Sequence, residues 1–329
     1  MSAKVFVSTV PFGEYDDTPR RLLASAGAEL AVNPLGRRLK APELASFLGG
    51  VDALIAGTEP ITDAVMAAAP RLKLIARVGI GLDNVDLTAA RDRGIAVSYT
   101  PDAPSPAVAE LAIGHIIAVL RGTAIADRGL RRSNWARSYG RRIACSTIGV
   151  LGVGRIGSRV INLLSSFEGC RVLANDVNPT ATLGPHASWA DKETIYREAD
   201  VITVHLPLTP QTRGLIGAPE LGLMKPDAIL INTARGGIVD EKALFDALTS
   251  DRIAGAAVDV FENEPYDGPL REVDSCLLSC HMGSMSFDCR VRMEKEATEE
   301  VVRLLEREAL RSPVPEFEYA LRTEKAPVR

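Results

Sequence analysis

The sequence predicts an α/β protein made of two doubly wound parallel-sheet domains with a cleft between them. Short β-branched runs alternate with amphipathic stretches along most of the chain, a pattern typical of parallel sheets covered by helices. The chain also has 329 residues, which exceeds what one hydrophobic core usually organises. We therefore expect two cores, each built from its own series of strands and helices.

The first series begins at the N-terminus and ends near residue 100. Its strand-like runs are 4–10, 28–33, 52–57, 72–78 and 95–100, and amphipathic stretches at 19–27, 42–50, 63–70 and 86–94 lie between them. A proline-rich string, PDAPSPAV at 101–108, suits neither element and predicts a linker. A long apolar helix is expected over 109–130, with His115 as a structural residue within it.

The second series begins at residue 146. Its strand-like runs are 146–152, 170–176, 201–207, 228–234, 253–261 and 276–281, and helical stretches are expected at 154–167, 192–200, 220–227 and 241–250. A last helix, 288–311, is long enough to return to the first series. We therefore predict a discontinuous domain of residues 1–104 plus 293–329, and a second domain of residues 105–292.

Net charge and cysteine content narrow the function classes. A formal net charge of -4 gives no reason to expect nucleic acid, and the basic stretch at 128–142 is interpreted as solvated surface or a subunit contact. The longest apolar run, 111–120, is far shorter than the roughly 20 residues of a membrane span, so no membrane is expected. Five irregularly spaced cysteines, with no C-x-x-C pair, indicate a reducing, cytoplasmic location and no metal site.

Three glycines follow the first strand-like run of the second series. Gly152, Gly154 and Gly157 form a G-x-G-x-x-G pattern that opens an amphipathic helix. Gly152 permits a tight turn, Gly154 lets backbone amides approach a pyrophosphate, and Gly157 allows close packing of helix on strand. The pattern predicts a dinucleotide-binding loop, although a unit that binds S-adenosylmethionine, or a purely structural turn, remains an alternative.

An acidic residue selects among dinucleotides. Asp176 ends the next strand-like run, about twenty residues after the glycines, where it accepts hydrogen bonds from ribose hydroxyls. A carboxylate there repels a 2′-phosphate, and the following Val177, Asn178 and Pro179 offer no arginine to attract one. NAD is therefore predicted in preference to NADP.

Four polar residues follow later strands of the second series. Arg235, Asp259, Glu264 and His281 should converge at the carboxyl ends of these strands, where open parallel sheets bind ligands. Arginine holds carboxylates bidentately, and histidine exchanges protons near neutral pH. Taken singly, Arg235 could be a turn residue, Glu264 solvated surface and Asp259 a loop brace. Together with a dinucleotide loop, they indicate carbonyl reduction, in which Glu264 stabilises the imidazolium of His281.

An ordered set of motifs gives a resemblance to a known family. The chain resembles the D-isomer-specific 2-hydroxyacid dehydrogenases in ARVGIGLDNVDL (76–87), VAELAIGHIIAVLR (108–121), GVGRIG (152–157), ADVITVHLPLTPQTRGLI (199–216), NTARGGIVDEKALFDAL (232–248), GAAVDVFENEP (255–265) and CHMGS (280–284). The motifs cover nearly the whole chain in the family's order. The resemblance implies a Rossmann NAD-binding domain, a smaller flavodoxin-like substrate domain and a homodimer whose core contains the helix from Val108.

The resemblance also implies roles for individual residues. Arg235 would bind the carboxylate and carbonyl of a small 2-hydroxy or 2-keto acid, His281 would be the acid/base, Glu264 would tune His281, and Asp259 would lie by the nicotinamide. The first-domain loop of Arg77, Val78 and Gly79 would face the substrate carboxylate. The rest of the cofactor cradle would comprise Arg155, Ile156, Leu206, Pro207, Thr212, Thr233, Ala234 and Ser284.

Three departures from the family pattern bear on the substrate. Cys280 stands where proline commonly precedes the catalytic histidine, and Glu59 stands where phosphoglycerate dehydrogenases usually carry an arginine. A second phosphate anchor is therefore missing, but Arg77 could still bind a phosphate, a phosphonate or a second carboxylate, since its planar fork suits each of these groups. The chain also ends at 329, so no appended regulatory domain is expected. Trp135 is expected either to reach the partner subunit's active site or to be an ordinary interface aromatic.

The leading hypothesis is reversible hydride transfer between NAD(H) and C2 of a D-2-hydroxy acid or 2-keto acid. An alternative is an NAD(H)-sensing protein, similar to the transcriptional corepressors that share this fold, with little catalysis. A methyltransferase is a third hypothesis, but it gives no purpose to Arg235, Glu264 and His281.

Overall fold

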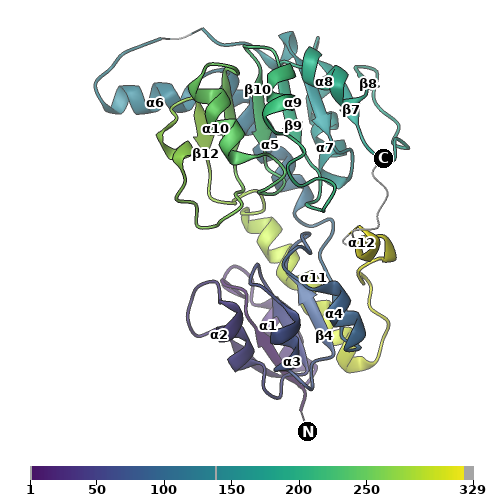
Figure 1. Cartoon of the computed structure of the whole chain (residues 1–329). Helices are drawn as coiled ribbons and strands as arrows, with labels where there is room; N and C mark the ends of the chain where they lie inside the picture. The colour runs from purple at the N-terminus through teal and green to yellow at the C-terminus, as the bar shows by residue number, and fades with distance from the viewer. Residues whose placement is uncertain (1, 138, 322–329) are drawn as a thin grey trace. The chain divides into compact units, whose positions relative to one another are not determined.

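The chain folds into two compact units (Figure 1). The computed structural model describes residues 2–137 and 139–321. One unit joins residues 2–104 to 285–321, and the other comprises 105–284. The sequence placed the return to the first unit at residue 293, which lies inside helix α11 (Phe287–Glu306), whereas the contacts change at Met285 in the loop before this helix. Residues 322–329 of the expected first domain lie outside the described residues.

The first unit is a five-stranded parallel sheet with the order β2-β1-β3-β4-β5. Its strands are β1 (Lys4–Val7), β2 (Glu29–Val32), β3 (Ala53–Ala56), β4 (Leu74–Arg77) and β5 (Ala96–Ser98), and its helices are α1 (Thr18–Ser25), α2 (Ala41–Phe47), α3 (Asp63–Ala67), α4 (Leu87–Asp92), α11 and α12 (Glu316–Ala320). This strand order is that of a flavodoxin-like sheet. Helix α11 packs on α1, β3 and β4, so a C-terminal segment completes the N-terminal fold.

The second unit is a seven-stranded parallel sheet with the order β12-β11-β10-β9-β6-β7-β8. Its strands are β6 (Thr147–Leu151), β7 (Arg171–Asn175), β8 (Ala187–Trp189), β9 (Val201–Val204), β10 (Ile229–Asn232), β11 (Gly255–Val258) and β12 (Cys276–Leu278). Its helices are α5 (Ser105–Leu120), α6 (Thr123–Arg131), α7 (Arg155–Leu164), α8 (Lys192–Glu198), α9 (Ala218–Leu223) and α10 (Glu241–Thr249), with short 3₁₀ turns η1 (Ile143–Cys145) and η2 (Pro269–Glu272). The order is that of a doubly wound Rossmann sheet.

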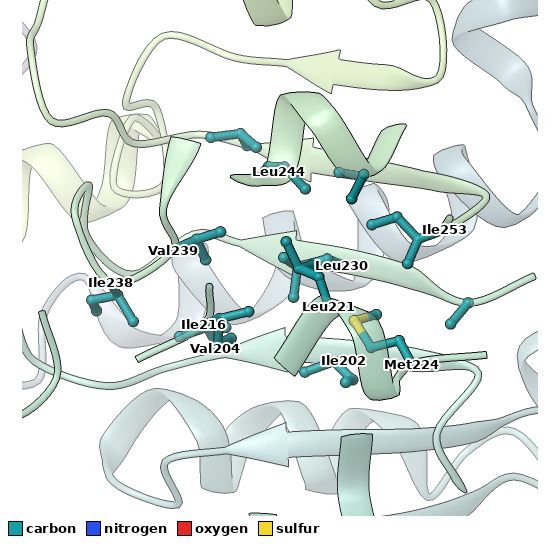
Figure 2. Packing of buried hydrophobic residues seen from close by; sticks show 14 of the residues in the cluster. Ile202, Val204, Ile216, Leu221, Met224, Leu230, Ile238, Val239, Leu244 and Ile253 are labelled. Carbon is teal, nitrogen blue, oxygen red and sulfur yellow. The ribbon is translucent and has the colours of Figure 1, made fainter. Parts of the chain in front are cut away.

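Both faces of the second sheet are covered, which explains why its central strands are buried without alternation. Helices α5 and α7 cover one face, where Ile116 and Val160 pack against Val150. Helices α8, α9 and α10 cover the other face, and Figure 2 shows Leu221 and Leu244 of this layer beside Leu230 of β10. All four residues of β9 and of β10 are buried. The carboxyl ends of these strands are therefore held by a rigid core.

The long apolar helix expected over 109–130 is instead two helices. Helix α5 ends at Leu120, Gly122 adopts a left-handed conformation with φ +60°, and α6 begins at Thr123. The two helices bend by 63°, and α6 has no buried residue and extends away from the sheet (Figure 1). Among the described residues, no single helix is long and apolar enough to cross a membrane. Only when α5 and α6 are counted together do they have the length and composition of a membrane span.

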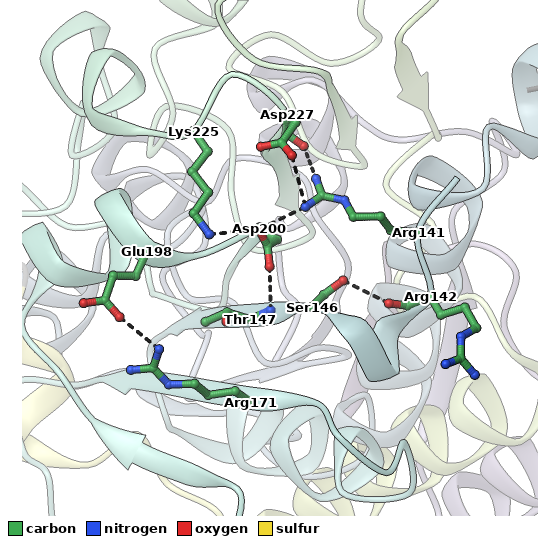
Figure 3. A network of polar contacts seen from close by, with 9 residues as sticks. All are labelled: Arg141, Arg142, Ser146, Thr147, Arg171, Glu198, Asp200, Lys225 and Asp227. Atoms are coloured by element: carbon green, nitrogen blue, oxygen red, sulfur yellow. Dashed lines mark hydrogen bonds and ion pairs between the residues drawn. The ribbon is translucent and has the colours of Figure 1, made fainter. Parts of the chain in front are cut away.

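A polar cluster fastens the segment after α6 to the base of the second sheet (Figure 3). The carboxylate of Asp200 accepts hydrogen bonds from Arg141 at 3.0 Å, from Lys225 at 2.9 Å and from the backbone N–H of Thr147 at 2.8 Å. Burial raises the pKa of Asp200, but these donors outweigh burial and hold its pKa below the ordinary value. The cluster stabilises the amino-terminal edge of the sheet, opposite the edge where ligands bind.

Candidate active site

The loops that leave β6, β9, β10, β11 and β12 lie at one edge of the second sheet, because all its strands run parallel. The order of strands reverses between β6 and β9, since β7 and β8 lie on one side of β6 and β9 to β12 lie on the other. Such a reversal opens a crevice at the carboxyl ends of the strands, where doubly wound sheets bind ligands.

The glycine loop joins β6 to α7 at this reversal. Gly152 has φ +94°, and a Cβ there would lie 2.6 Å from the carbonyl oxygen of His205. A Cβ on Gly157 would collide with the carbonyl oxygen of Gly152, so both glycines are required by the fold. A Cβ on Gly154, at the start of α7, would meet nothing within 4 Å. The loop therefore leaves open space at the helix N-terminus, which suits an anionic group such as a pyrophosphate.

Asp176 lies just after β7 and is tied to the glycine loop. Its Oδ2 accepts a hydrogen bond from the backbone N–H of Val153 at 2.7 Å, and its Oδ1 accepts one from Asn178 at 2.9 Å. Each carboxylate oxygen keeps further acceptor capacity after these bonds. The structure thus holds an oriented carboxylate beside the glycine loop.

The other residues expected in the cradle lie in the same loops. Arg155 and Ile156 begin α7, and Ser284 ends the second unit. After β9, Leu206 packs on the apolar core and the Thr212 hydroxyl donates to the carbonyl oxygen of Pro207 at 2.6 Å. The remaining two residues follow β10. The amide of Ala234 donates to Asn232 at 3.1 Å, while the Oγ1 of Thr233 is buried without a hydrogen-bond partner among the described residues. A buried hydroxyl without a partner fits a site that a ligand completes.

His281 and Glu264 form a directly bonded pair. The Nδ1 of His281 lies 2.9 Å from Oε2 and 3.0 Å from Oε1 of Glu264. Glu264 Oε1 also accepts a hydrogen bond from the backbone N–H of Phe261 at 3.1 Å, which fixes the carboxylate. Because Nδ1 faces a carboxylate, it is the ring nitrogen that donates to Glu264, and Nε2 is the other ring nitrogen. The side chains are 36% and 28% exposed, so the ring remains accessible to a substrate.

Asp259 organises the turn that carries His281. It follows β11 and is fully buried, with 0% exposure. Its carboxylate accepts hydrogen bonds from the backbone N–H groups of Met282 and Gly283, both at 2.9 Å, and its carbonyl oxygen accepts one from the N–H of His281 at 2.7 Å. His281 adopts φ +49°, an uncommon value for a non-glycine residue that these bonds enforce.

Arg235 occupies the turn after β10. The side chain of Asn232 shapes this turn by donating to the carbonyl oxygen of Arg235 at 3.0 Å. The guanidinium of Arg235 donates to the carbonyl oxygen of Ala234 at 2.7 Å. A Cβ on Gly236 would collide with the backbone of Phe261, so the loop of Arg235 lies against the loop of Glu264. The structure therefore brings the loop that carries Arg235 into contact with the loop that carries Glu264.

The first unit holds the expected substrate loop after β4. Arg77 is 4% exposed, and its guanidinium donates to the carbonyl oxygens of Ala56 at 3.1 Å, of Gly81 at 2.9 Å and of Gly57. The N–H groups of Val78 and Gly79 also have partners within the unit: the carbonyl oxygen of Ala56 at 2.8 Å and the hydroxyl of Thr100 at 2.9 Å. Arg77 therefore binds backbone carbonyl groups of loops within the first unit.

Sequence reasoning missed residues that support the site from behind. Asn232 braces the turn of Arg235, and Ser279 donates to Asp259 at 2.6 Å. Both are polar residues at the end of an apolar strand, and this position in the sequence could have identified them as candidates. Among the described residues, no group of three or more His, Cys, Asp or Glu side chains is arranged to hold a metal ion.

Comparisons with known proteins identify the family of the chain. A sequence model of the D-isomer specific 2-hydroxyacid dehydrogenase NAD binding domain matches residues 113–283. The chain is 38% identical to a glyoxylate reductase of Thermofilum pendens, over 76% of this chain and 77% of the relative. The chain belongs to the D-isomer-specific 2-hydroxyacid dehydrogenase family.

Further relatives of this 2-hydroxyacid dehydrogenase differ in length. It is 35% identical to a hydroxypyruvate reductase of Thermotoga maritima, over 81% of this chain and 89% of the relative. It is 38% identical to a D-3-phosphoglycerate dehydrogenase of Mycobacterium leprae, of which it spans only 56%. The solved structure of a D-lactate dehydrogenase from Aquifex aeolicus, complexed with NAD and lactic acid, has a TM-score of 0.82 at 25% identity and covers 92% of this chain and 95% of its own.

Family membership makes the chain an NAD-dependent oxidoreductase of 2-hydroxy and 2-keto acids. The open space at Gly154, the unpartnered hydroxyl of Thr233 and the oriented carboxylate of Asp176 fit the NAD that the family uses. The matched family and relatives are enzymes, so neither the corepressor-like sensor nor the S-adenosylmethionine alternative is supported.

Proposed function

We propose that the dehydrogenase interconverts a small 2-keto acid and its D-2-hydroxy acid, with the proton carried by His281. The observation that carries this proposal is the bonded pair of His281 and Glu264 on the same sheet edge as the glycine loop. A histidine held by a carboxylate is a proton donor for an oxygen that becomes an alkoxide. The cofactor, when bound in its reduced form NADH, would supply the hydride that C2 accepts during reduction.

The residues of the chain divide the remaining work. Arg235 holds the substrate carboxylate and polarises the carbonyl oxygen, since its planar fork suits two oxygens at once. His281 donates the Nε2 proton to the carbonyl oxygen in reduction and removes it in oxidation. Glu264 keeps the Nδ1 proton in place and stabilises the positive ring. Asp259 holds the turn of His281 and places negative charge behind it.

The glycine loop and its neighbours form the proposed NAD cradle. The backbone of Gly154, Arg155 and Ile156 faces the pyrophosphate, and Asp176 accepts the ribose hydroxyls. Gly152 and Gly157 permit this approach. The side of the cradle formed by the loops after β9, β10 and β12 comprises Leu206, Pro207, Thr212, Thr233, Ala234 and Ser284.

We further propose that the substrate carries no phosphate, phosphonate or second carboxylate. The guanidinium of Arg77 donates to three carbonyl oxygens, and the nearby carboxylate of Glu59 is 1% exposed and accepts from the N–H of Gly57 at 2.9 Å. In this arrangement Arg77 holds the loop of Val78 and Gly79 in shape for a compact substrate. Relatives named glyoxylate reductase and hydroxypyruvate reductase act on such compounds.

Assembly and location are also part of the proposal. The helices α5 and α6 and the segment after them expose large apolar side chains, at Ile117, Ile125, Leu130, Trp135 and Tyr139. We propose that a second copy of the chain covers these side chains in a homodimer, because large exposed apolar side chains that gather on neighbouring segments are typical of interfaces. All five cysteines are free, which fits the reducing cytoplasm. Light scattering of the purified protein should give twice the mass of 35.2 kDa, and a monomer would contradict the dimer.

A keto-acid panel tests the proposed reaction. NADH oxidation is measured with glyoxylate, hydroxypyruvate, longer 2-keto acids and phosphohydroxypyruvate, and the unphosphorylated compounds should give the higher kcat/KM. Arg235→Lys, which keeps the charge but loses the fork, should raise KM for the keto acid strongly. Arg271→Lys, at an exposed arginine, is the matched control. A preference for phosphohydroxypyruvate would contradict the substrate proposal, and inactivity on every member would contradict the reaction.

A further inference from the structure

A chain of hydrogen bonds runs from α5 to the turn of His281, inside the second unit. His115 lies on α5 and is 6% exposed. Its Nε2 is 3.0 Å from the hydroxyl of Ser279, and that hydroxyl is 2.6 Å from Oδ1 of Asp259. None of the catalytic roles described above uses His115 or Ser279.

Proton positions in this chain follow from the inventory of donors. A carboxylate only accepts, so the single hydroxyl proton of Ser279 goes to Asp259. The Ser279 oxygen must then accept from His115, which requires a proton on Nε2 of that ring. Burial lowers the pKa of His115, although the charge of Asp259 opposes this effect, so the ring is neutral around pH 7 and is the Nε2–H tautomer.

Asp259 transmits its position to His281 through three bonds. Its carboxylate holds the N–H groups of Met282 and Gly283, and its carbonyl oxygen holds the N–H of His281. A Cβ on Gly283 would lie 3.2 Å from Val108 of α5 and 3.3 Å from Oδ2 of Asp259, so the turn is pressed closely against the helix. A rotation of the Asp259 carboxylate would therefore move the ring of His281 relative to Glu264.

We propose that His115 is a positioning residue, which orients Asp259 through Ser279 and thereby holds His281 against Glu264. This inference rests on the proposed function, because the effect on turnover requires that His281 carries the proton. His115 touches neither substrate nor cofactor in this scheme. It acts only through the turn that carries His281. The structural residue expected from the sequence thus also positions the acid/base histidine.

A double-mutant cycle tests the coupling. His115→Leu should lower kcat about 3- to 10-fold with little change in KM for the keto acid, the size of one lost hydrogen bond. Ser279→Ala should lower kcat at least as much, and adding His115→Leu to Ser279→Ala should lower it no further. His115→Gln, whose amide reaches the same hydroxyl, should recover activity to within about twofold of the wild type. Full activity in His115→Leu, or additive losses in the double variant, would overturn the proposal.

A spectroscopic readout separates this inference from the proposed reaction. The chain has 4 histidines, so ¹⁵N-labelled histidine gives a simple spectrum in which each tautomer is read directly. At neutral pH, His115 should be the Nε2–H tautomer in the wild type, and this preference should disappear in Ser279→Ala. In His115→Leu, the resonances of His281 should shift, while those of His186 and His205 should not change. An Nδ1–H tautomer would overturn the inference even in an active enzyme. An inactive wild type with the expected spectrum would refute the reaction alone, and equal melting temperatures exclude misfolding.

Discussion

Replacing Glu264 with glutamine isolates its charge from its shape. In the wild type, Oε1 accepts from both Phe261 N–H and His281 Nδ1, and Oε2 accepts from Nδ1 at 2.9 Å. Glutamine places its oxygen where Oε1 stands, so Nδ1–H of His281 keeps only a neutral acceptor at that position, and the NH₂ that replaces Oε2 faces Nδ1–H as a second donor. The substitution thus removes a charge-assisted hydrogen bond and disfavours the protonated ring.

The magnitude follows from the exposure of the pair. A hydrogen bond to a charged group contributes about 1.5–3 kcal/mol, and the lower half of that range applies because the two side chains are 36% and 28% exposed. A loss of about 1.5–2 kcal/mol from the transition state corresponds to a roughly 10- to 30-fold lower kcat in keto-acid reduction. KM should change little, since Arg235 binds the carboxylate.

The assay is steady-state NADH oxidation with a saturating 2-keto acid. Glu262→Gln is the matched control, because Glu262 is exposed in the same loop and its carboxylate lies 3.9 Å from Arg213. That variant should stay within about twofold of the wild type. If Glu264→Gln retained wild-type kcat, the idea that this carboxylate supports the proton donor would be refuted.

Three further predictions concern the cofactor and the scaffold. Asp176→Ala should raise the KM for NADH and let NADPH turn over, because the repulsive carboxylate is gone; unchanged rejection of NADPH in the ratio of kcat/KM values would argue against its role. Gly157→Ala should abolish NADH binding or lower the melting temperature strongly, since its methyl group collides with the carbonyl oxygen of Gly152, whereas Gly154→Ala should melt normally. Asp200→Asn should be less stable than the wild type at neutral pH. The pKa of Asp200 is lower in the folded than in the unfolded protein, so its carboxylate stabilises the fold above the unfolded pKa of about 4, and this stabilisation is lost as the pH falls through the folded pKa. If the melting temperatures of the wild type and the variant still differed at low pH, this explanation would be contradicted.

Much of the fold could be predicted because the alternation of short apolar strands with amphipathic helices is a clear pattern of parallel sheets. The central strands β9 and β10 of the second unit are buried at every residue, as expected for a sheet covered on both faces. Element ends were less predictable: the expected helix over 109–130 breaks at Gly122, and the last helix ends at Glu306, where Arg307 takes φ +61°. Tertiary contacts determine where these helices end, and the local sequence is only a weak guide to the end positions.

The site was predictable where strand ends alone determine proximity. His281, Glu264 and Asp259 follow β11 and β12, which are neighbours, so their meeting follows from the order of strands. The partners of Arg77 were not predictable, because the carbonyl oxygens of Ala56 and Gly81 that it binds depend on how two loops fold. The bond from His115 to Ser279 joins residues 164 positions apart and has no sequence signature.

The most direct test of the account is a single-turnover measurement of hydride transfer. Enzyme loaded with NADH is mixed rapidly with glyoxylate, and NADH disappearance is followed for the wild type and for His281→Ala. General acid catalysis typically contributes about 10²- to 10⁴-fold, so the variant should transfer hydride slower by a factor in that range while still binding NADH. Transfer at the wild-type rate in His281→Ala would show that another group supplies the proton.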